Sequence, residues 1–267
     1  MTQATTSAGA QRIAAAFAAS GKRAALMPYL MGGHPDIATS LAIGNAYADG
    51  GADLIELGIP FSDPIADGPV IQAAATRALA AGTRVADVFG ICAELAPRLP
   101  VVLMTYANLV LARGVEGFAA DAAAAGASGL IVPDLPLEEA PAALAACDAA
   151  GVALVPLVAP TTTDERLARI GERARGFLYT VSVTGTTGER AVLSDTFASV
   201  VERARAHTEV PVALGFGIAT PEQASAAADA GADGVIVGSR LVREAAESAD
   251  PAAATGALVA AFAQALR

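Results

Sequence analysis

Short apolar runs alternate with Ala-rich stretches along most of this chain, and the runs begin near residues 24, 54, 101, 129, 153, 177, 212 and 234. Each run is nearly continuous rather than alternately apolar and polar, as at 101–106 and 177–181. Strands that are covered on both faces have this pattern, and the Ala-rich stretches between them have the length of helices. The pattern therefore predicts about eight parallel strands separated by helices.

One unit of this pattern recurs. The segments 51–57, 126–132 and 231–237 each follow an Ala-rich stretch, begin with Gly-Ala and continue into an apolar run. Such a recurrence is typical of a fold built from repeated helix and strand units. The fifth position after each first glycine is Glu56, Ile131 or Ile236, so a carboxylate stands where the sister units carry isoleucine.

Eight such units in 267 residues predict an α/β fold, a single-domain (β/α)8 TIM barrel over residues 1–267. We expect an extra N-terminal helix at about 11–19 and a last covering helix at 251–266. A doubly wound sheet is the alternative, but no G-x-G-x-x-G follows the first run. Helix starts are predicted at Asp36, at Thr162 with Glu165 three residues on, and at Thr220 with Gln223.

Charge and composition exclude several classes of function and partner. The formal charge is −10, which argues against a nucleic-acid partner, so an anionic ligand would need local help from backbone N–H groups and helix N-termini. No apolar run approaches the roughly 20 residues that span a bilayer, and no signal peptide is predicted. Cys92 and Cys147 form neither a disulfide framework nor a metal-ligand spacing. We therefore expect a cytoplasmic chain without a metal site.

The residue that stands out chemically is Glu56, because a charged side chain inside a buried strand is costly unless it is paired, neutralised or used. No basic residue lies in a predicted strand to pair with it. Active residues of barrels come from the carboxyl ends of strands and the loops that follow, and Asp63 and Asp67 lie on the loop after Glu56. Asp-Pro and Asp-Gly are also ordinary turn dipeptides, so these two aspartates are open to either interpretation.

Glycine-rich segments follow three late strands, at 185–188, 215–218 and 238–239. Barrels often bind phosphate with such loops, although ordinary tight turns explain the same glycines. Other residues carry weaker signals. His34 and Asp134 are interpreted as possible helix caps, His207 as a surface residue at a helix end, and Tyr106 and Tyr179 as either pocket lining or plugs of the barrel top.

Several segments together are similar to a known family. The segments 56–69, 106–108, 132–136, 185–188, 215–218 and 238–239 closely resemble, in the same order, motifs of the tryptophan synthase α subunit. The resemblance runs from about residue 10 to 245, and its longest motif is ELGIPFSDPIADGP at 56–69. It departs from the family pattern at His34 and Val183, which lie at loop edges.

The resemblance implies a (β/α)8-barrel carbon–carbon lyase that cleaves indole-3-glycerol phosphate to indole and glyceraldehyde 3-phosphate. Glu56 and Asp67 match the catalytic residues. The positions implied to contact substrate are Tyr29, Leu103, Tyr106, Ile131, Leu157, Tyr179, Thr187, Gly188, Phe216, Gly217, Gly238 and Ser239.

The resemblance also implies a partner. Asp63 and Pro64 would face a β subunit in an α2β2 heterotetramer, and indole would pass to that subunit for L-tryptophan synthesis. Pyridoxal phosphate is expected only in the β partner, so no cofactor is expected in this chain.

The chemistry has its own rationale. Cleavage requires a proton on indole C3 and loss of a proton from the adjacent hydroxyl, roles suited to Glu56, while Asp67 would stabilise the charged ring nitrogen. Three rivals stay open: a lyase that acts without a β partner, an idle subunit that only activates β, and a different phosphate-binding barrel. The presence of both carboxylates argues against the second, and the acidic motif at 56–69 argues against the third.

Overall fold

The computed structural model describes residues 7–181, 190–215 and 217–267, and for residues 190–197 it describes the backbone alone. Within these residues nine parallel strands form one sheet in the order β5-β4-β3-β2-β1-β9-β8-β7-β6. The strands are β1 (Ala25–Met31), β2 (Ile55–Gly58), β3 (Val101–Met104), β4 (Gly129–Ile131), β5 (Ala153–Val155), β6 (Leu157–Val158), β7 (Leu178–Val181), β8 (Val212–Gly215) and β9 (Gly234–Val237).

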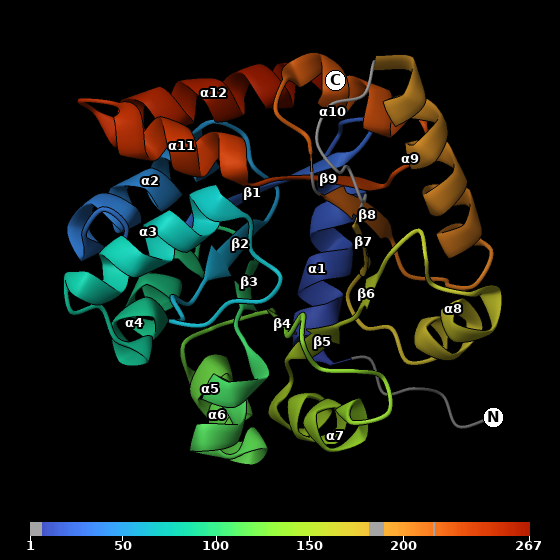
Figure 1. The fold of residues 1–267 in the computed structure, drawn as a ribbon, viewed down its shortest axis with the longest axis horizontal. Helices are drawn as coiled ribbons and strands as arrows, with labels where there is room; N and C mark the ends of the chain where they lie inside the picture. Colours follow the sequence, from blue (N-terminus) through green and yellow to red (C-terminus); the bar gives the residue numbers. More distant parts are fainter. Residues whose placement is uncertain (1–6, 182–189, 216) are drawn as a thin grey trace.

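The first and last strands of this order, β5 and β6, are consecutive in the chain and are separated by Pro156 alone. Proline has no N–H to donate to a strand ladder, so the single run predicted at 153–158 divides there. The Pro156 carbonyl still accepts a hydrogen bond from the Tyr179 N–H at 3.0 Å. The two halves occupy one position of the barrel and bring its edges together, which confirms the predicted (β/α)8 fold (Figure 1).

Helices surround the strands, except for α1, which lies in the middle of the ring in this view (Figure 1). They are α1 (Ala8–Ala19), α2 (Ile37–Asp49), α3 (Pro69–Ala80), α4 (Val85–Leu95), α5 (Ala107–Arg113), α6 (Val115–Ala124), α7 (Ala140–Ala150), α8 (Asp164–Gly171), α9 (Arg190–Arg205), α10 (Pro221–Asp229), α11 (Ser239–Glu247) and α12 (Pro251–Ala265).

The expected extra N-terminal helix is α1, which starts at Ala8, three residues before the predicted start. It packs on the amino-terminal ends of the strands rather than joining the outer ring. Ile13 is fully buried in the barrel interior, and the Phe17 ring lies 5.9 Å from that of Phe177, which precedes β7. The helix therefore closes the barrel at the end opposite the carboxyl ends of the strands.

Side chains alternate strictly between the two faces of each strand. Those of one set fill the barrel interior, and those of the other pack against the surrounding helices. Ile131 and Ile236, the counterparts of Glu56 in the repeated unit, both belong to the interior set. Glu56 lies in the same interior-facing position of its strand, because it lines the carboxylate cavity inside the barrel together with Ile236.

The helix starts agree with the predictions at two of three places. Asp36 caps α2 by accepting a hydrogen bond from the Thr39 N–H at 2.8 Å, and Thr220 forms a capping box with Gln223 at α10. The prediction at Thr162 is wrong by one residue, because Thr163 caps α8. The Thr162 hydroxyl instead accepts from the Ala159 N–H at 3.0 Å and closes the preceding turn.

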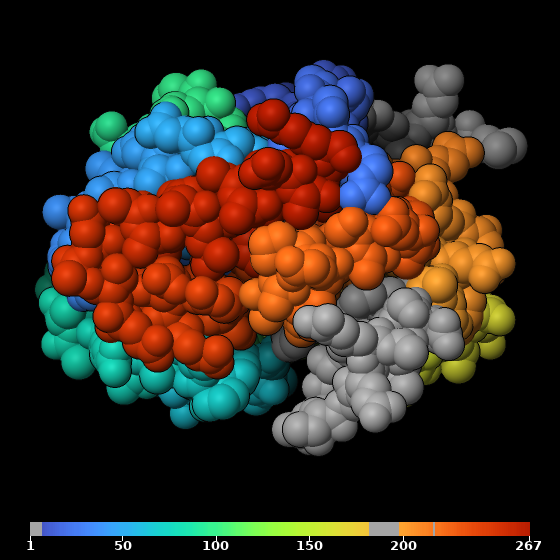
Figure 2. Space-filling view, turned by 90° about the horizontal axis from the view of Figure 1, so that it is seen from above, coloured from blue at the N-terminus to red at the C-terminus, as the bar shows by residue number. Residues whose placement is uncertain are grey.

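One flank of the molecule is covered by α11 and α12, which lie side by side (Figure 2). The buried Val259 and Phe262 of α12 pack into the outer core, where α12 also contacts α2. Among the described helices, none has the length and apolar character needed to span a membrane.

Candidate active site

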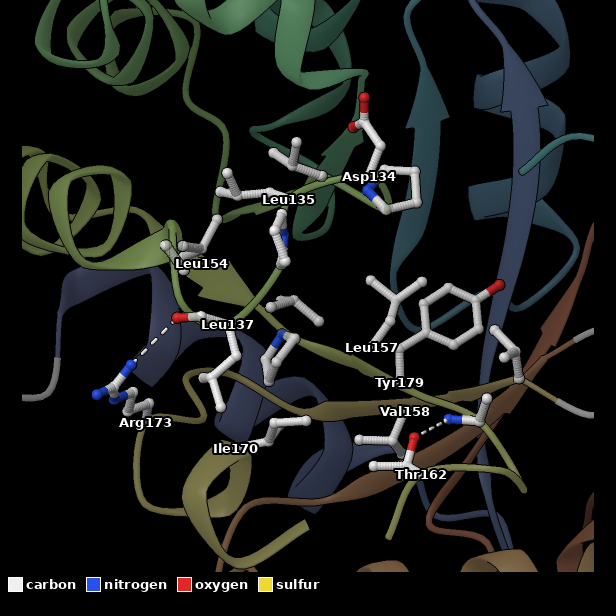
Figure 3. A pocket seen from close by; sticks show the side chains of 18 of the residues that line it. Asp134, Leu135, Leu137, Leu154, Leu157, Val158, Thr162, Ile170, Arg173 and Tyr179 are labelled. Atoms are coloured by element: carbon white, nitrogen blue, oxygen red, sulfur yellow. Dashed lines mark hydrogen bonds between the residues drawn. The ribbon is translucent and has the colours of Figure 1, made fainter. Parts of the chain in front are cut away.

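Two adjoining cavities open at the carboxyl ends of the strands, and Met104 and Tyr179 line both. The carboxylate cavity has a volume of about 310 Å³; its lining comprises Tyr29, Glu56, Asp67, Gly68, Ile71, Met104, Tyr179, Gly217, Ile218, Ala219, Ile236, Gly238, Ser239, Arg240 and Arg243. The apolar cavity has a volume of about 900 Å³ and lies between the loops after β4 and β6 and the helices α7 and α8. Figure 3 shows this second cavity, with Leu135, Leu157 and Ile170 among its apolar side chains.

Glu56 is held deep in the carboxylate cavity by β2, between Tyr29 of β1 and Val102 of β3. The residue is 1% exposed, and within the described part of the chain its Oε2 has no hydrogen-bond partner and its carboxylate no ion pair. Burial raises the pKa of Glu56 to about 8, and the nearby charge of Asp67 raises it further in the same direction. Its carboxyl group can therefore both give and take a proton near neutral pH.

Glycines make room for the two tyrosine rings that lie beside this carboxyl group. A Cβ added at Gly58, two residues beyond Glu56 on the same face of β2, would collide with the Tyr29 hydroxyl. A Cβ at Gly215, at the end of β8, would collide with the Tyr179 ring. Both tyrosines are 5% exposed, so their rings occupy the space that the missing side chains leave and wall the cavity on two sides.

Asp67 reaches the same cavity from the loop after β2, two residues before α3 begins. Its pKa is raised by partial burial, and hydrogen bonding from the Tyr106 hydroxyl opposes that rise. The Asp67 carbonyl accepts a hydrogen bond from the Gln72 side chain at 2.7 Å, which ties the loop to α3. Two carboxyl groups in different surroundings thus share one cavity, an arrangement that divides acid and base roles.

The other end of the carboxylate cavity suits an anion. Gly217 has a φ of 80°, a left-handed conformation that favours glycine, and Gly238 and Ser239 stand at the start of α11. Arg240 and Arg243, on the same face of this helix, also line the cavity. Sequence reasoning missed both arginines; their i, i+3 spacing after the Gly-Ser pair was the available signal. Arg240 also pairs with Glu244 at 2.6 Å.

Some of the residues that the resemblance implied to contact substrate do not line either cavity. The prediction for Leu103 is wrong, because its side chain lies on the outer face of β3, in the core under the helices. The residue of β3 that lines the carboxylate cavity is the next one along the strand, Met104. Ile131 lies in the barrel interior and lines neither cavity. Leu157 lines the apolar cavity. Thr187, Gly188 and Phe216 lie outside the described residues.

The structure also shows what surrounds Asp134 and His34, which the sequence indicated as helix caps. Asp134 does not cap the next helix; it accepts a hydrogen bond from the Ala107 N–H at 2.8 Å and caps α5 instead. His34 is not the cap of α2, and it is 3% exposed, with neither ring nitrogen hydrogen-bonded within the described residues. Its pKa is lowered by burial and by Arg77. Among the described residues no group of three or more potential metal ligands is present.

A (β/α)8 barrel that brings two carboxyl groups and an anion-binding end into one cavity defines an enzyme of acid–base chemistry. The family model for the tryptophan synthase alpha chain matches residues 16–267. The chain belongs to the tryptophan synthase alpha chain family and is a carbon–carbon lyase, as the motifs indicated.

Individual relatives agree with this assignment. The tryptophan synthase alpha chain of Prochlorococcus marinus (strain MIT 9313) is 53% identical over 229 residues, which cover 85% of this chain and 83% of the relative. That of Gloeobacter violaceus is 50% identical over 236 residues, covering 87% and 86%.

Solved structures agree as well. A chain of Mycobacterium tuberculosis tryptophan synthase is 41% identical with a TM-score of 0.88, covering 96% of this chain and 98% of that one. A chain of the tryptophan synthase a2b2 complex from Pyrococcus furiosus is 39% identical with a TM-score of 0.85, covering 90% and 98%.

Proposed function

We propose that the carboxylate cavity cleaves indole-3-glycerol phosphate to indole and glyceraldehyde 3-phosphate. The observation that carries this proposal is the Glu56 carboxyl group, buried without an ion pair among the described residues and open to the same cavity as Asp67. Family membership supplies the substrate. Residues 1–267 are proposed to act as one domain, because all the described strands belong to one sheet.

Glu56 alone can donate the proton that indole C3 requires and accept the proton that the hydroxyl loses. With a pKa of about 8 the carboxyl group is mostly protonated at pH 7 and can donate its proton to indole C3. The resulting carboxylate then takes the proton of the hydroxyl on the adjacent carbon. The carbon–carbon bond breaks, its electron pair neutralises the indole ring, and the hydroxyl carbon becomes the aldehyde. Glu56 ends protonated, ready for the next substrate.

Asp67 is proposed to act on the charge that this step creates. When C3 accepts a proton, positive charge develops on the ring nitrogen, and a carboxylate beside the N–H stabilises it. Asp67 must therefore be ionised. The hydrogen bond from Tyr106 favours the ionised form, because it lowers the pKa of Asp67.

The phosphate group is proposed to bind at the start of α11, at Gly238 and Ser239, with Gly217 as a further residue that lines the same cavity. The helix N-terminus contributes N–H groups, and Arg240 and Arg243 contribute positive charge to a chain whose formal net charge is −10. The indole ring then lies toward Tyr29, Met104 and Tyr179, at the apolar side.

The partner is proposed to be a tryptophan synthase β subunit in an α2β2 heterotetramer, as in the Pyrococcus furiosus complex. Asp63 is exposed and Pro64 half-exposed on the loop after β2, where a partner can reach them. Indole would pass to that subunit for L-tryptophan synthesis, and pyridoxal phosphate would be bound there rather than in this chain. A biosynthetic role of this kind and two free buried cysteines suit the cytoplasm.

The experiment is the cleavage of indole-3-glycerol phosphate by the wild-type chain and by Glu56→Gln, with and without a β subunit. We expect Glu56→Gln to abolish turnover and to retain binding of glycerol 3-phosphate. Glu94→Gln, the same change at an exposed position of α4, is the matched control and should keep wild-type turnover. Substantial turnover by Glu56→Gln would refute the assignment, and high activity without β would favour the stand-alone lyase.

A further inference from the structure

We propose that Tyr106 is a positioning residue that holds both ends of the segment 61–67 and thereby sets where Asp67 stands. The inference rests on the proposed function, because it concerns the delivery of Asp67 to the same cavity. Tyr106 was expected to contact substrate, yet it is not among the residues that line either cavity. Its contacts point instead to the loop.

Tyr106 touches the segment at its start and at its end. At the start, the rings of Tyr106 and Phe61 are stacked, with centroids 5.3 Å apart and planes inclined by 27°. At the end, the Ala66 N–H donates a hydrogen bond to the Tyr106 hydroxyl at 3.1 Å. The same hydroxyl lowers the pKa of the carboxyl group of Asp67, the next residue. One side chain therefore contacts both ends of a seven-residue segment, at Phe61 and at Ala66 beside Asp67.

Tyr106 is itself well fixed. It is 3% exposed, lies two residues beyond β3, and is the N-cap residue of α5. On one side the Thr105 N–H donates to the Ile131 carbonyl at 3.0 Å, and on the other the Ala107 N–H donates to Asp134 at 2.8 Å. Tyr106 is thus fixed to the barrel wall on both sides of the position from which it contacts the loop.

The part of the segment between these contacts is exposed. Ser62 and Asp63 are exposed, and the Ile65 side chain is 81% exposed. These residues include the proposed partner surface. A partner bound there would contact a segment whose two ends are held by Tyr106, so that a shift of the segment would reach Asp67 through the Tyr106 contacts. Tyr106 is therefore placed to connect partner binding with the geometry of the site.

The test is Tyr106→Phe, which keeps the stacked ring and removes the hydroxyl. We expect kcat for indole-3-glycerol phosphate to fall about 10- to 100-fold, because small misplacements of a catalytic group cost up to about that factor. KM should stay within about twofold, because Tyr106 does not touch substrate. Phe61→Leu removes the stack and keeps the hydroxyl; it should lower kcat less.

The pH profile separates positioning from a merely structural role. Among the described residues, the titratable groups facing Asp67 are Tyr29, Glu56, Tyr106 and Tyr179. Without the Tyr106 hydroxyl the pKa of Asp67 rises, so the acidic limb of kcat moves to higher pH in Tyr106→Phe. In Phe61→Leu that limb should stay in place.

The matched control is Tyr47→Phe. Tyr47 is also buried, at 1% exposure, and its hydroxyl donates to the Tyr29 carbonyl at 3.3 Å on the outer side of β1. It should lose stability without moving the pH profile. An unmoved acidic limb in folded Tyr106→Phe, or a higher KM with wild-type kcat, overturns the inference. Absence of cleavage by the wild-type chain would instead overturn the proposed function.

Discussion

Glu56→Gln should remove part of the pH dependence of the unfolding free energy. The wild-type side chain is buried and neutral in the folded chain, with a pKa of about 8 instead of the ordinary 4.5. A group whose pKa is raised by folding contributes most at low pH, and that contribution is lost as the pH rises through the folded value. The window therefore runs from about pH 4.5 to about pH 8. Glutamine does not ionise, so the variant escapes this loss.

The magnitude follows from the size of the shift. The difference between about 8 and 4.5 is about 3.5 pH units, and one unit corresponds to about 1.36 kcal/mol, which makes about 5 kcal/mol at most. Between pH 5 and pH 9 the difference in unfolding free energy between variant and wild type should move by about 4 kcal/mol in favour of Glu56→Gln. The unpaired amide adds a destabilisation of about 1–3 kcal/mol that does not depend on pH.

Urea unfolding of both proteins at pH 5, 7 and 9 measures this difference. The unfolding free energy is summed over all transitions, so that an intermediate does not distort the comparison. Every other titrating group is present in both proteins and cancels to first order. Glu94→Gln, at an exposed position, should show a difference that stays constant with pH. A constant difference for Glu56→Gln as well would refute the reasoning, since it would mean that Glu56 ionises at its ordinary pKa.

Three further outcomes are expected. Asp67→Asn should lower kcat strongly with little change in the unfolding free energy measured in urea. Wild-type turnover by this variant would indicate that Asp67 serves only as a turn residue. Gly217→Ala places a side chain at a φ of 80° and should weaken glycerol 3-phosphate binding in calorimetry, and unchanged affinity would argue against the anion-binding end. Met104→Ala should raise KM, whereas Leu103→Ala, on the outer face of the same strand, should cost about 2–5 kcal/mol of stability and leave KM unchanged.

The alternation of strands and helices, and the equivalence of position 56 to two isoleucine positions, could be predicted from the chain alone. Both depend on local periodicity: apolar runs of strand length, glycine stops, and a unit that recurs with Glu56 in place of Ile131 and Ile236. The misplacement of the pocket residue at Leu103 shows the limit of that reasoning. A shift of one residue along a strand turns the side chain to the opposite face, and the motif does not specify the register.

What the tertiary structure decided concerns residues that are distant in sequence. Tyr106 follows β3 and Asp67 follows β2, yet the tyrosine holds the segment that carries the aspartate. The same holds for Arg243, which becomes part of the site only because α11 starts at the cavity.

Sequence by itself therefore determined the fold class, the family and the presence of a carboxyl group in a buried strand, because these follow from local pattern and composition. Only the tertiary structure decided which neighbours surround Glu56 and how its pKa rises to about 8. The physical reason is that burial and electrostatic coupling depend on distances between segments, and those distances are set when the barrel closes.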